Sequence, residues 1–193
     1  MSNTLLSPDA PHGSETDESG SSSGSDNPPE PEGDQPDAES AASKPTFELE
    51  ASGRSPGVVE SLRQGIEAVI PLLPRPLDRL SVRVVSDAEM TELHGRWKQV
   101  ARTTDVVTFD LTEEGETAVV VDMAICDDEA RRQSVERGHD LPDELLLYVI
   151  HGLLHCCGHD DQTVEQAQAM HLEEDRLLER IGRRPISLRG EAS

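Results

Sequence analysis

The chain has 193 residues, of which 34% are hydrophobic and 2% aromatic, and its formal net charge is −22 at pH 7. This length holds one domain and a tail, and the low apolar content indicates that part of the chain does not fold. The acidic charge excludes broad electrostatic attraction to nucleic acid, which depends on lysine and arginine neutralising phosphates, so any RNA contact must come from local basic clusters.

Residues 1–45 consist mainly of Ser, Gly, Pro, Asp and Glu, and their charged groups are ten acidic residues and Lys44. Such a segment cannot bury enough apolar surface to offset the entropy lost on ordering. We therefore predict a disordered acidic tail over residues 1–45, a folded domain over residues 46–185 and a flexible C-terminus over residues 186–193.

The cysteines, Cys126, Cys156 and Cys157, do not form the paired framework of a secreted disulfide protein. The N-terminus has no basic start followed by an apolar stretch, and the longest apolar run, Leu145 to Leu154, is too short to span a bilayer. We expect a cytoplasmic protein with no membrane partner.

Hydrophobic spacing and breaker residues predict the elements of the domain. In chain order these are a helix over 57–73, a strand over 80–85, a helix over 87–98 capped by Ser86, an antiparallel hairpin of strands over 106–111 and 117–125, and helices over 127–137, from 141 onward and over 164–181. The fold class is α+β, with a small mixed sheet of about four strands and helices packed against it. The helix that begins at Leu141 is apolar nearly all round, which predicts burial, whereas the last helix has the pattern of a packing helix with one wet face.

His151 and His155 lie four residues apart on the helix that is expected to be buried. Residues at this spacing are helical neighbours with Cβ atoms about 5–6 Å apart, so both imidazoles can reach one metal ion. Gly158 can end the helix in a left-handed conformation and turn the chain back. The third ligand is then His159, Asp160 or Asp161.

The spacing of these ligands matches that of metzincin proteases, but those enzymes place a glutamate general base directly after the first histidine. Gly152 occupies this position here, so zinc peptidase chemistry is disfavoured. A structural zinc site usually closes with four cysteine-rich ligands, whereas three ligands leave a position for water and favour catalysis. We interpret Cys156 and Cys157 as small buried apolar side chains.

The chain resembles the YbeY family of metal-dependent endoribonucleases that act in ribosomal RNA maturation. Three stretches carry the resemblance, which covers roughly residues 47–185: His151 to Asp161, Thr104-Asp105-Val106-Val107-Thr108-Phe109 and Val121 to Cys126. The resemblance implies one Zn²⁺ per chain held by His151, His155 and Asp161, with His159 as the alternative third ligand.

Three positions depart from the family pattern. Asp161 stands where the family usually has a third histidine, and aspartate is a competent oxygen ligand for zinc. Lys98 stands where the family usually has arginine, so the charge is kept while the bidentate fork is lost. Thr103 replaces a proline. Lys98 is the expected phosphate-stabilising residue, and Asp160 is our hypothesis for the general base.

The resulting hypothesis is a single-strand-specific, metal-dependent endoribonuclease in ribosomal RNA maturation and ribosome quality control. Its expected partners are single-stranded ribosomal RNA and the ribosome or its proteins, with no DNA. The alternatives are a ribosome-binding maturation factor with a mainly structural zinc, a zinc peptidase-like hydrolase, and an iron site built on a facial triad. The candidate basic clusters are Arg96-Trp97-Lys98 with Arg102, Arg131-Arg132, which we interpret as ordinary surface charge, and Arg183-Arg184 with Arg189.

Overall fold

The computed structural model describes residues 5–6, 44–98 and 104–186, and these ranges form an α+β fold, as predicted. The sheet is mixed and has five strands in the order β1-β4-β5-β3-β2. The elements are β1 Leu5–Leu6, β2 Thr46–Glu50, α1 Pro56–Val69, the 3₁₀ turn η1 Ile70–Leu72, β3 Leu77–Val85, α2 Asp87–Lys98, β4 Val106–Asp110, β5 Val119–Cys126, α3 Asp127–Arg137, α4 Leu141–Cys156 and α5 Val164–Arg180.

The pairing of the strands is parallel except at the predicted hairpin. β2 pairs with β3 and β3 pairs with β5 in parallel, and the two-residue β1 pairs in parallel with β4. β4 and β5 are antiparallel, with Val106 opposite Ile125 and Asp110 opposite Val121, which confirms the predicted hairpin. β4 is therefore the last long strand on its side of the sheet, with only β1 beyond it.

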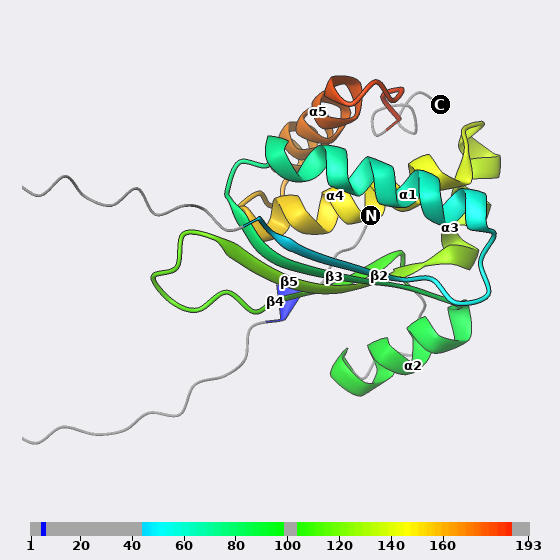
Figure 1. Cartoon of the computed structure of the whole chain (residues 1–193), viewed down its shortest axis with the longest axis horizontal. Helices are drawn as coiled ribbons and strands as arrows, with labels where there is room; N and C mark the ends of the chain where they lie inside the picture. The colour runs from blue at the N-terminus through cyan, green and yellow to red at the C-terminus, as the bar shows by residue number, and fades with distance from the viewer. Residues whose placement is uncertain (1–4, 7–43, 99–103, 187–193) are drawn as a thin grey trace, which may run out of the picture. The chain divides into compact units, whose positions relative to one another are not determined.

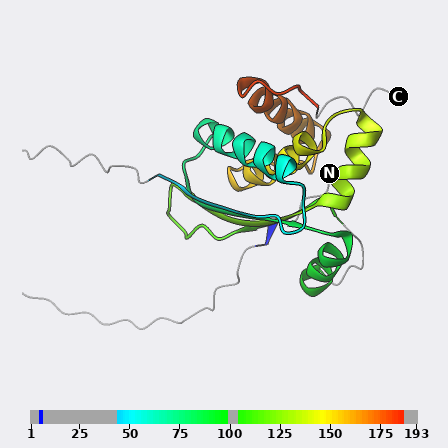
Figure 2. The ribbon, with the colours of Figure 1, turned by 45° about the vertical axis from the view of Figure 1, so that its right-hand side comes forward.

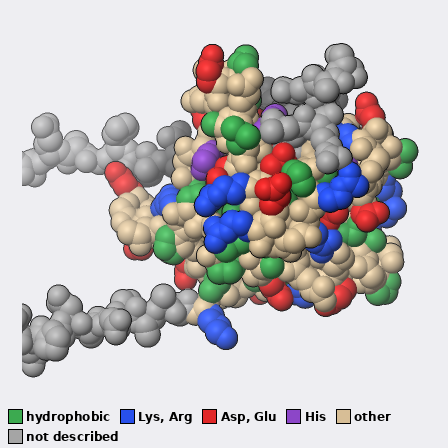
Figure 3. All heavy atoms as spheres, turned by 90° about the horizontal axis from the view of Figure 1, so that it is seen from above, with side chains coloured by type: hydrophobic (Ala, Val, Ile, Leu, Met, Phe, Trp, Pro, Cys, Tyr) green, Lys and Arg blue, Asp and Glu red, His purple; other side chains and the backbone are tan. Residues whose placement is uncertain are grey.

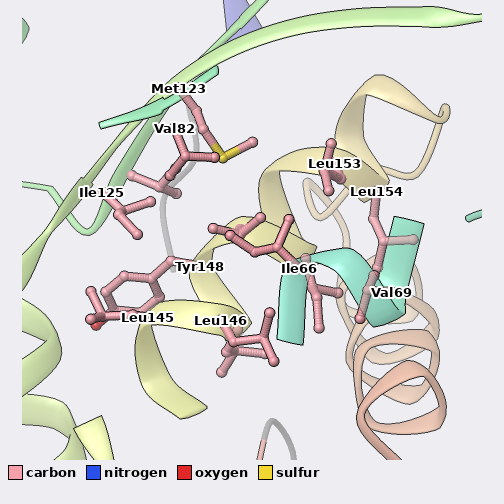
Figure 4. Packing of buried hydrophobic residues seen from close by; sticks show 14 of the residues in the cluster. Ile66, Val69, Val82, Met123, Ile125, Leu145, Leu146, Tyr148, Leu153 and Leu154 are labelled. Carbon is pink, nitrogen blue, oxygen red and sulfur yellow. The ribbon is translucent and has the colours of Figure 1, made fainter. Parts of the chain in front are cut away.

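The helices cover the two faces of the sheet unequally. Figures 1 and 2 show α1, α3, α4 and α5 on one side of the sheet and α2 on the other. The main core lies on the four-helix side and includes Ile66 of α1, Ile125 of β5 and Tyr148 of α4, as Figure 4 shows. A smaller cluster under α2 consists of Val85, Met90, Val107, Ala124 and Cys126.

α4 is the central helix of the domain. Every residue from Glu144 to Cys156 is buried, which confirms that the apolar pattern of this segment indicates burial. The helix packs against α1, α3, α5, β4 and β5. Any group carried by α4 in this range is therefore held rigidly by neighbours on several sides.

Several boundaries differ from the sequence prediction, β3 for example beginning at Leu77 and not at Leu80, and two differences have a clear physical reason. The first helix ends at Val69 and continues only as the 3₁₀ turn, because Pro71 has no backbone N–H to donate to a further α-helical turn. β2 was not predicted as a strand. It has only two apolar residues, Phe47 and Leu49, and this is too short an alternation to detect without its partner β3.

Most of the predicted tail, residues 1–45, and residues 187–193 lie outside the described residues, whereas Ile186 packs in the core. Within the described ranges no helix is long and apolar enough to cross a membrane. On the helical side of the molecule, basic and acidic side chains are interspersed (Figure 3).

Candidate metal centre

His151 and His155 project from α4 into one buried site. Their exposed fractions are 1% and 7%, and their Nε2 atoms lie 3.2 Å apart. The ring centroids are 4.7 Å apart and the ring planes meet at 89°. The two Nε2 atoms therefore converge, as the spacing of four residues on a helix predicts.

The chain reverses after α4 and brings a carboxylate back to the two imidazoles. Gly158 has φ of +97°, and the amides of Gly158 and His159 donate to the carbonyl oxygens of His155 and Leu154. Asp161 then places Oδ2 3.8 Å from Nε2 of His151 and Oδ1 3.9 Å from Nε2 of His155. One ligand atom from each of these three residues lies within 4.8 Å of the others, so the group could hold a metal ion.

The other predicted site residues lie elsewhere. His159 directs its carbonyl oxygen to Nδ1 of His155, and Asp160 accepts a hydrogen bond from the amide of Asp161. Neither side chain belongs to the group of three. Lys98 is the last residue of α2, and its side chain lies outside the described residues.

The hydrogen bonds behind the imidazoles fix which ring nitrogens carry protons. Nδ1 of His151 lies 2.7 Å from Oε1 of Glu174, and Nδ1 of His155 lies 3.1 Å from the carbonyl oxygen of His159. Both partners accept hydrogen bonds, so both Nδ1 atoms donate and both Nε2 atoms carry lone pairs. The two Nε2 lone pairs and the carboxylate face one another with no hydrogen between them. This arrangement suits a bound cation, which can accept a lone pair from each of the three groups.

The electrostatic environment keeps His155 in the form that binds metals. Burial lowers the pKa of His155 below its ordinary value, and the neighbouring His151 lowers it further, whereas Asp161 acts in the opposite direction. Only a neutral imidazole has a lone pair to donate to a metal. His155 therefore needs to release no proton before it could donate to a metal ion at neutral pH.

Sequence reasoning missed Glu174, which lies on the helix interpreted only as a packing helix. The buried residues of α5 are Met170, Glu174, Leu177 and Leu178. The sequence did contain a sign of its role, a carboxylate within an otherwise apolar stripe of the helix, because a buried acid requires a specific partner. The identity of that partner, His151, depends on how α5 packs against α4.

Arg75 was also not predicted, and it anchors the end of the ligand-bearing helix. Its guanidinium donates to the carbonyl oxygens of Cys156, Glu116 and Thr117 at 3.0–3.2 Å. This contact ties the C-terminal end of α4 to the loop between β4 and β5. Burial raises the pKa of the Cys156 thiol, which is absent from the group of three, in keeping with its interpretation as an apolar side chain.

Two of the candidate basic clusters are engaged in ion pairs within the fold. Arg131 pairs with Asp127 at 3.0 Å, and Arg132 pairs with Asp87 at 2.7 Å. In the last cluster, Arg183 donates to Asp143 at 2.7 Å. The Arg131 pair lies within α3, whereas Arg132 links α3 to α2 and Arg183 reaches α4, so the three guanidinium groups have structural partners.

A protein-family model described as Endoribonuclease YbeY matches residues 58–182, a range that includes all three residues of the candidate metal group. The chain belongs to the YbeY family. It is 33% identical over 115 residues to Endoribonuclease YbeY of Acidothermus cellulolyticus. The aligned region covers 53% of this chain and 70% of the relative. It is also 33% identical over 114 residues to Endoribonuclease YbeY of Mycobacterium tuberculosis, which covers 54% of this chain and 64% of the relative, or slightly less than two thirds of its length.

A solved structure shares the fold. The solution structure of a Thermotoga maritima protein matches with a TM-score of 0.53 and 25% identity, covering 70% of this chain and 89% of that protein.

Proposed function

We propose that this protein is a metal-dependent endoribonuclease that cleaves single-stranded RNA during ribosomal RNA maturation and ribosome quality control. Membership of the YbeY family supports an endoribonuclease. The observation that carries the metal dependence is the convergence of two buried imidazole Nε2 atoms and the Asp161 carboxylate. We propose one Zn²⁺ per chain, because two nitrogens and one oxygen suit zinc and leave a position for water.

A bound zinc ion would supply Lewis-acid chemistry, either polarising a phosphoryl oxygen or lowering the pKa of a water molecule. In this proposal His151, His155 and Asp161 hold the ion, and Lys98 stabilises negative charge on the phosphate. Asp160 is the candidate general base, since it is half-buried and adjacent to Asp161. Gly152 leaves no carboxylate at the position that zinc peptidases use for this role.

The proposed partners are single-stranded ribosomal RNA and the ribosome or its proteins. The net charge of −22 favours a basic protein partner, so docking on a ribosomal protein would bring the site to RNA that the chain as a whole repels. We place this activity in the cytoplasm. None of the cysteines forms a disulfide, which suits a reducing compartment.

The proposal is tested by cleavage of matched RNA substrates. The full chain is treated with a chelator, and cleavage of a single-stranded RNA and of the same sequence in a duplex is measured before and after Zn²⁺ is restored. We expect zinc-dependent cleavage of the single strand only. Zinc-loaded protein that leaves both substrates intact would contradict the proposal, and equal cleavage of both would contradict the single-strand specificity.

The acidic charge also favours a second candidate function, a ribosome-binding maturation factor whose zinc is mainly structural. The two functions differ in what metal removal does. A structural zinc contributes folding energy directly, so the chelated protein would unfold. A catalytic zinc on the rigid α4 would leave circular dichroism largely unchanged on removal while abolishing cleavage.

A further inference from the structure

Glu174 is a fully buried carboxylate, with 0% of its surface exposed. It lies on α5 between the buried residues Met170 and Leu177, which pack in the main core. Burying a carboxylate among apolar side chains costs folding free energy unless a partner compensates its charge. The polar contacts of Glu174 therefore indicate what it does.

His151 is the group that holds this carboxylate. Oε1 of Glu174 accepts from Nδ1 of His151 at 2.7 Å, and Oε2 has no hydrogen-bond partner among the described residues. Within the same residues, Glu174 forms an ion pair with His151 and with no lysine or arginine. One neutral imidazole is a weak compensation for a buried charge.

The contact becomes stronger when His151 is a metal ligand. If Nε2 of His151 donates its lone pair to a cation, the ring becomes more positive and its Nδ1–H becomes a better donor to the carboxylate. The same hydrogen bond keeps the proton on Nδ1 and so keeps the lone pair on Nε2, which faces His155 and Asp161. The buried carboxylate and a cation at the site thus stabilise each other.

We infer that Glu174 is a positioning residue of the metal centre, which holds His151 in the metal-binding tautomer and couples the packing of α5 to metal occupancy. The inference rests on the metal site of the proposed function but not on RNA cleavage. It assigns α5 a direct part in the site, although all three candidate ligands lie before this helix.

The test compares two substitutions that remove one carboxylate charge from the same helix. Glu174→Gln keeps the shape of the buried side chain, and Glu179→Gln is the matched control at an exposed position. Zn²⁺ affinity is measured by competition with a chromophoric chelator. Thermal unfolding midpoints of the full chain are measured with and without Zn²⁺ at the same mildly alkaline pH.

We expect Glu174→Gln to weaken Zn²⁺ binding by about 10–100-fold, the usual effect of losing a carboxylate behind a ligating histidine. Without metal, this variant should unfold at or above the temperature of the wild type, because a weakly compensated buried charge has been removed. Zinc should raise its midpoint less than it raises that of the wild type. Glu179→Gln should match the wild type in both measurements.

A purely structural role gives a different pattern. Glu174→Gln would then lower the unfolding midpoint equally with and without Zn²⁺ and leave the Zn²⁺ affinity unchanged, and this result would overturn the inference. If the glutamine variant does not fold, Glu174→Asp, which keeps the charge but shortens the side chain, takes its place, and unchanged Zn²⁺ affinity in that variant also overturns it. A wild type that binds zinc but cleaves no RNA would contradict the proposed function and leave the inference about Glu174 unaffected.

Discussion

The hydroxyl oxygen of Thr108 lies 2.5 Å from the point that a Cβ atom of residue 152 would occupy. Gly152 follows His151 on α4, and Thr108 is a buried residue of β4. A glycine at this position therefore allows the ligand-bearing helix to approach the strand. Gly152, which argues against peptidase chemistry because it is not a glutamate, is thus also required for the packing of α4 on β4.

Gly152→Ala is expected to destabilise the protein. The new methyl group would meet Oγ1 of Thr108 and also Cε of Met123, 3.2 Å away, and overpacking of this kind costs about 1–3 kcal/mol. Urea unfolding measures the change. Gly95→Ala on α2 is the control, because nothing lies within 4 Å of its Cβ position and removing an exposed helical glycine should stabilise by up to about 1 kcal/mol.

The clash has a defined source, which a second variant tests. Thr108→Ala removes the hydroxyl that the new methyl group would meet, so the double variant with Gly152→Ala should recover part of the lost stability. A Gly152→Ala protein as stable as the wild type would show that α4 and β4 have room to separate. Additive losses in the double variant would show that Thr108 is not the obstacle.

Asp161→Ala is expected to lose zinc. Its carboxylate lies 3.8 and 3.9 Å from the two Nε2 atoms, so its removal leaves two ligands where a zinc site needs at least three from the protein. Elemental analysis of the purified variant measures the loss. His159→Ala is the control, because only the backbone carbonyl of His159 contacts the site and the substitution keeps it. Zinc retained without Asp161 and lost without the His159 side chain would make His159 the third ligand.

Local patterns were sufficient to predict the part of the site that lies on one short segment. The two imidazoles depend on helical spacing, and the return of the chain depends on Gly158, so α4 and the turn after it could be located from a few adjacent residues. Asp161 was chosen as third ligand through the resemblance to the family. The geometry places its carboxylate beside both imidazoles.

The rest of the site depends on contacts between distant segments. Glu174 reaches His151 only because α5 folds back on α4, and Thr108 meets Gly152 only because β4 lies under that helix. Similarly, β2 forms a strand because it pairs with the edge of β3. No periodicity within these segments encodes the identity of the partner, so pattern reading predicted the elements better than it predicted their contacts.

His155 should contribute a loss of stability to the metal-free protein as the pH falls from about 8 to about 5. Burial and His151 hold the pKa of His155 below its ordinary value in the folded state, so the unfolded chain binds more protons in this range. Protonation therefore favours unfolding below the ordinary histidine pKa of about 6.5. Chemical denaturation of the chelated protein at several pH values measures the slope.

His155→Gln provides the comparison, because it removes this titrating group while the other acidic and basic groups stay. We expect the stability of the variant to depend less on pH than that of the wild type over the same interval. Identical slopes in the two proteins would assign the pH dependence to other groups. A variant whose stability falls more steeply on acidification than that of the wild type would contradict the lowered pKa of His155.

Lys98→Ala is expected to reduce RNA cleavage by roughly 10²–10³-fold, the usual effect of removing one group that stabilises transition-state charge. Zinc content and the unfolding midpoint should be unchanged, because Lys98 is the last residue of α2 and lies outside the metal group. Lys98→Arg should retain activity or exceed the wild type, since a guanidinium binds phosphate through two parallel hydrogen bonds. Arg79→Ala is the control for loss of a positive charge, because Arg79 is paired with Asp122 at 3.1 Å on the sheet. Cleavage by Lys98→Ala at the wild-type rate would remove Lys98 from the proposed mechanism, and equal losses in Lys98→Ala and Arg79→Ala would indicate a general effect of charge.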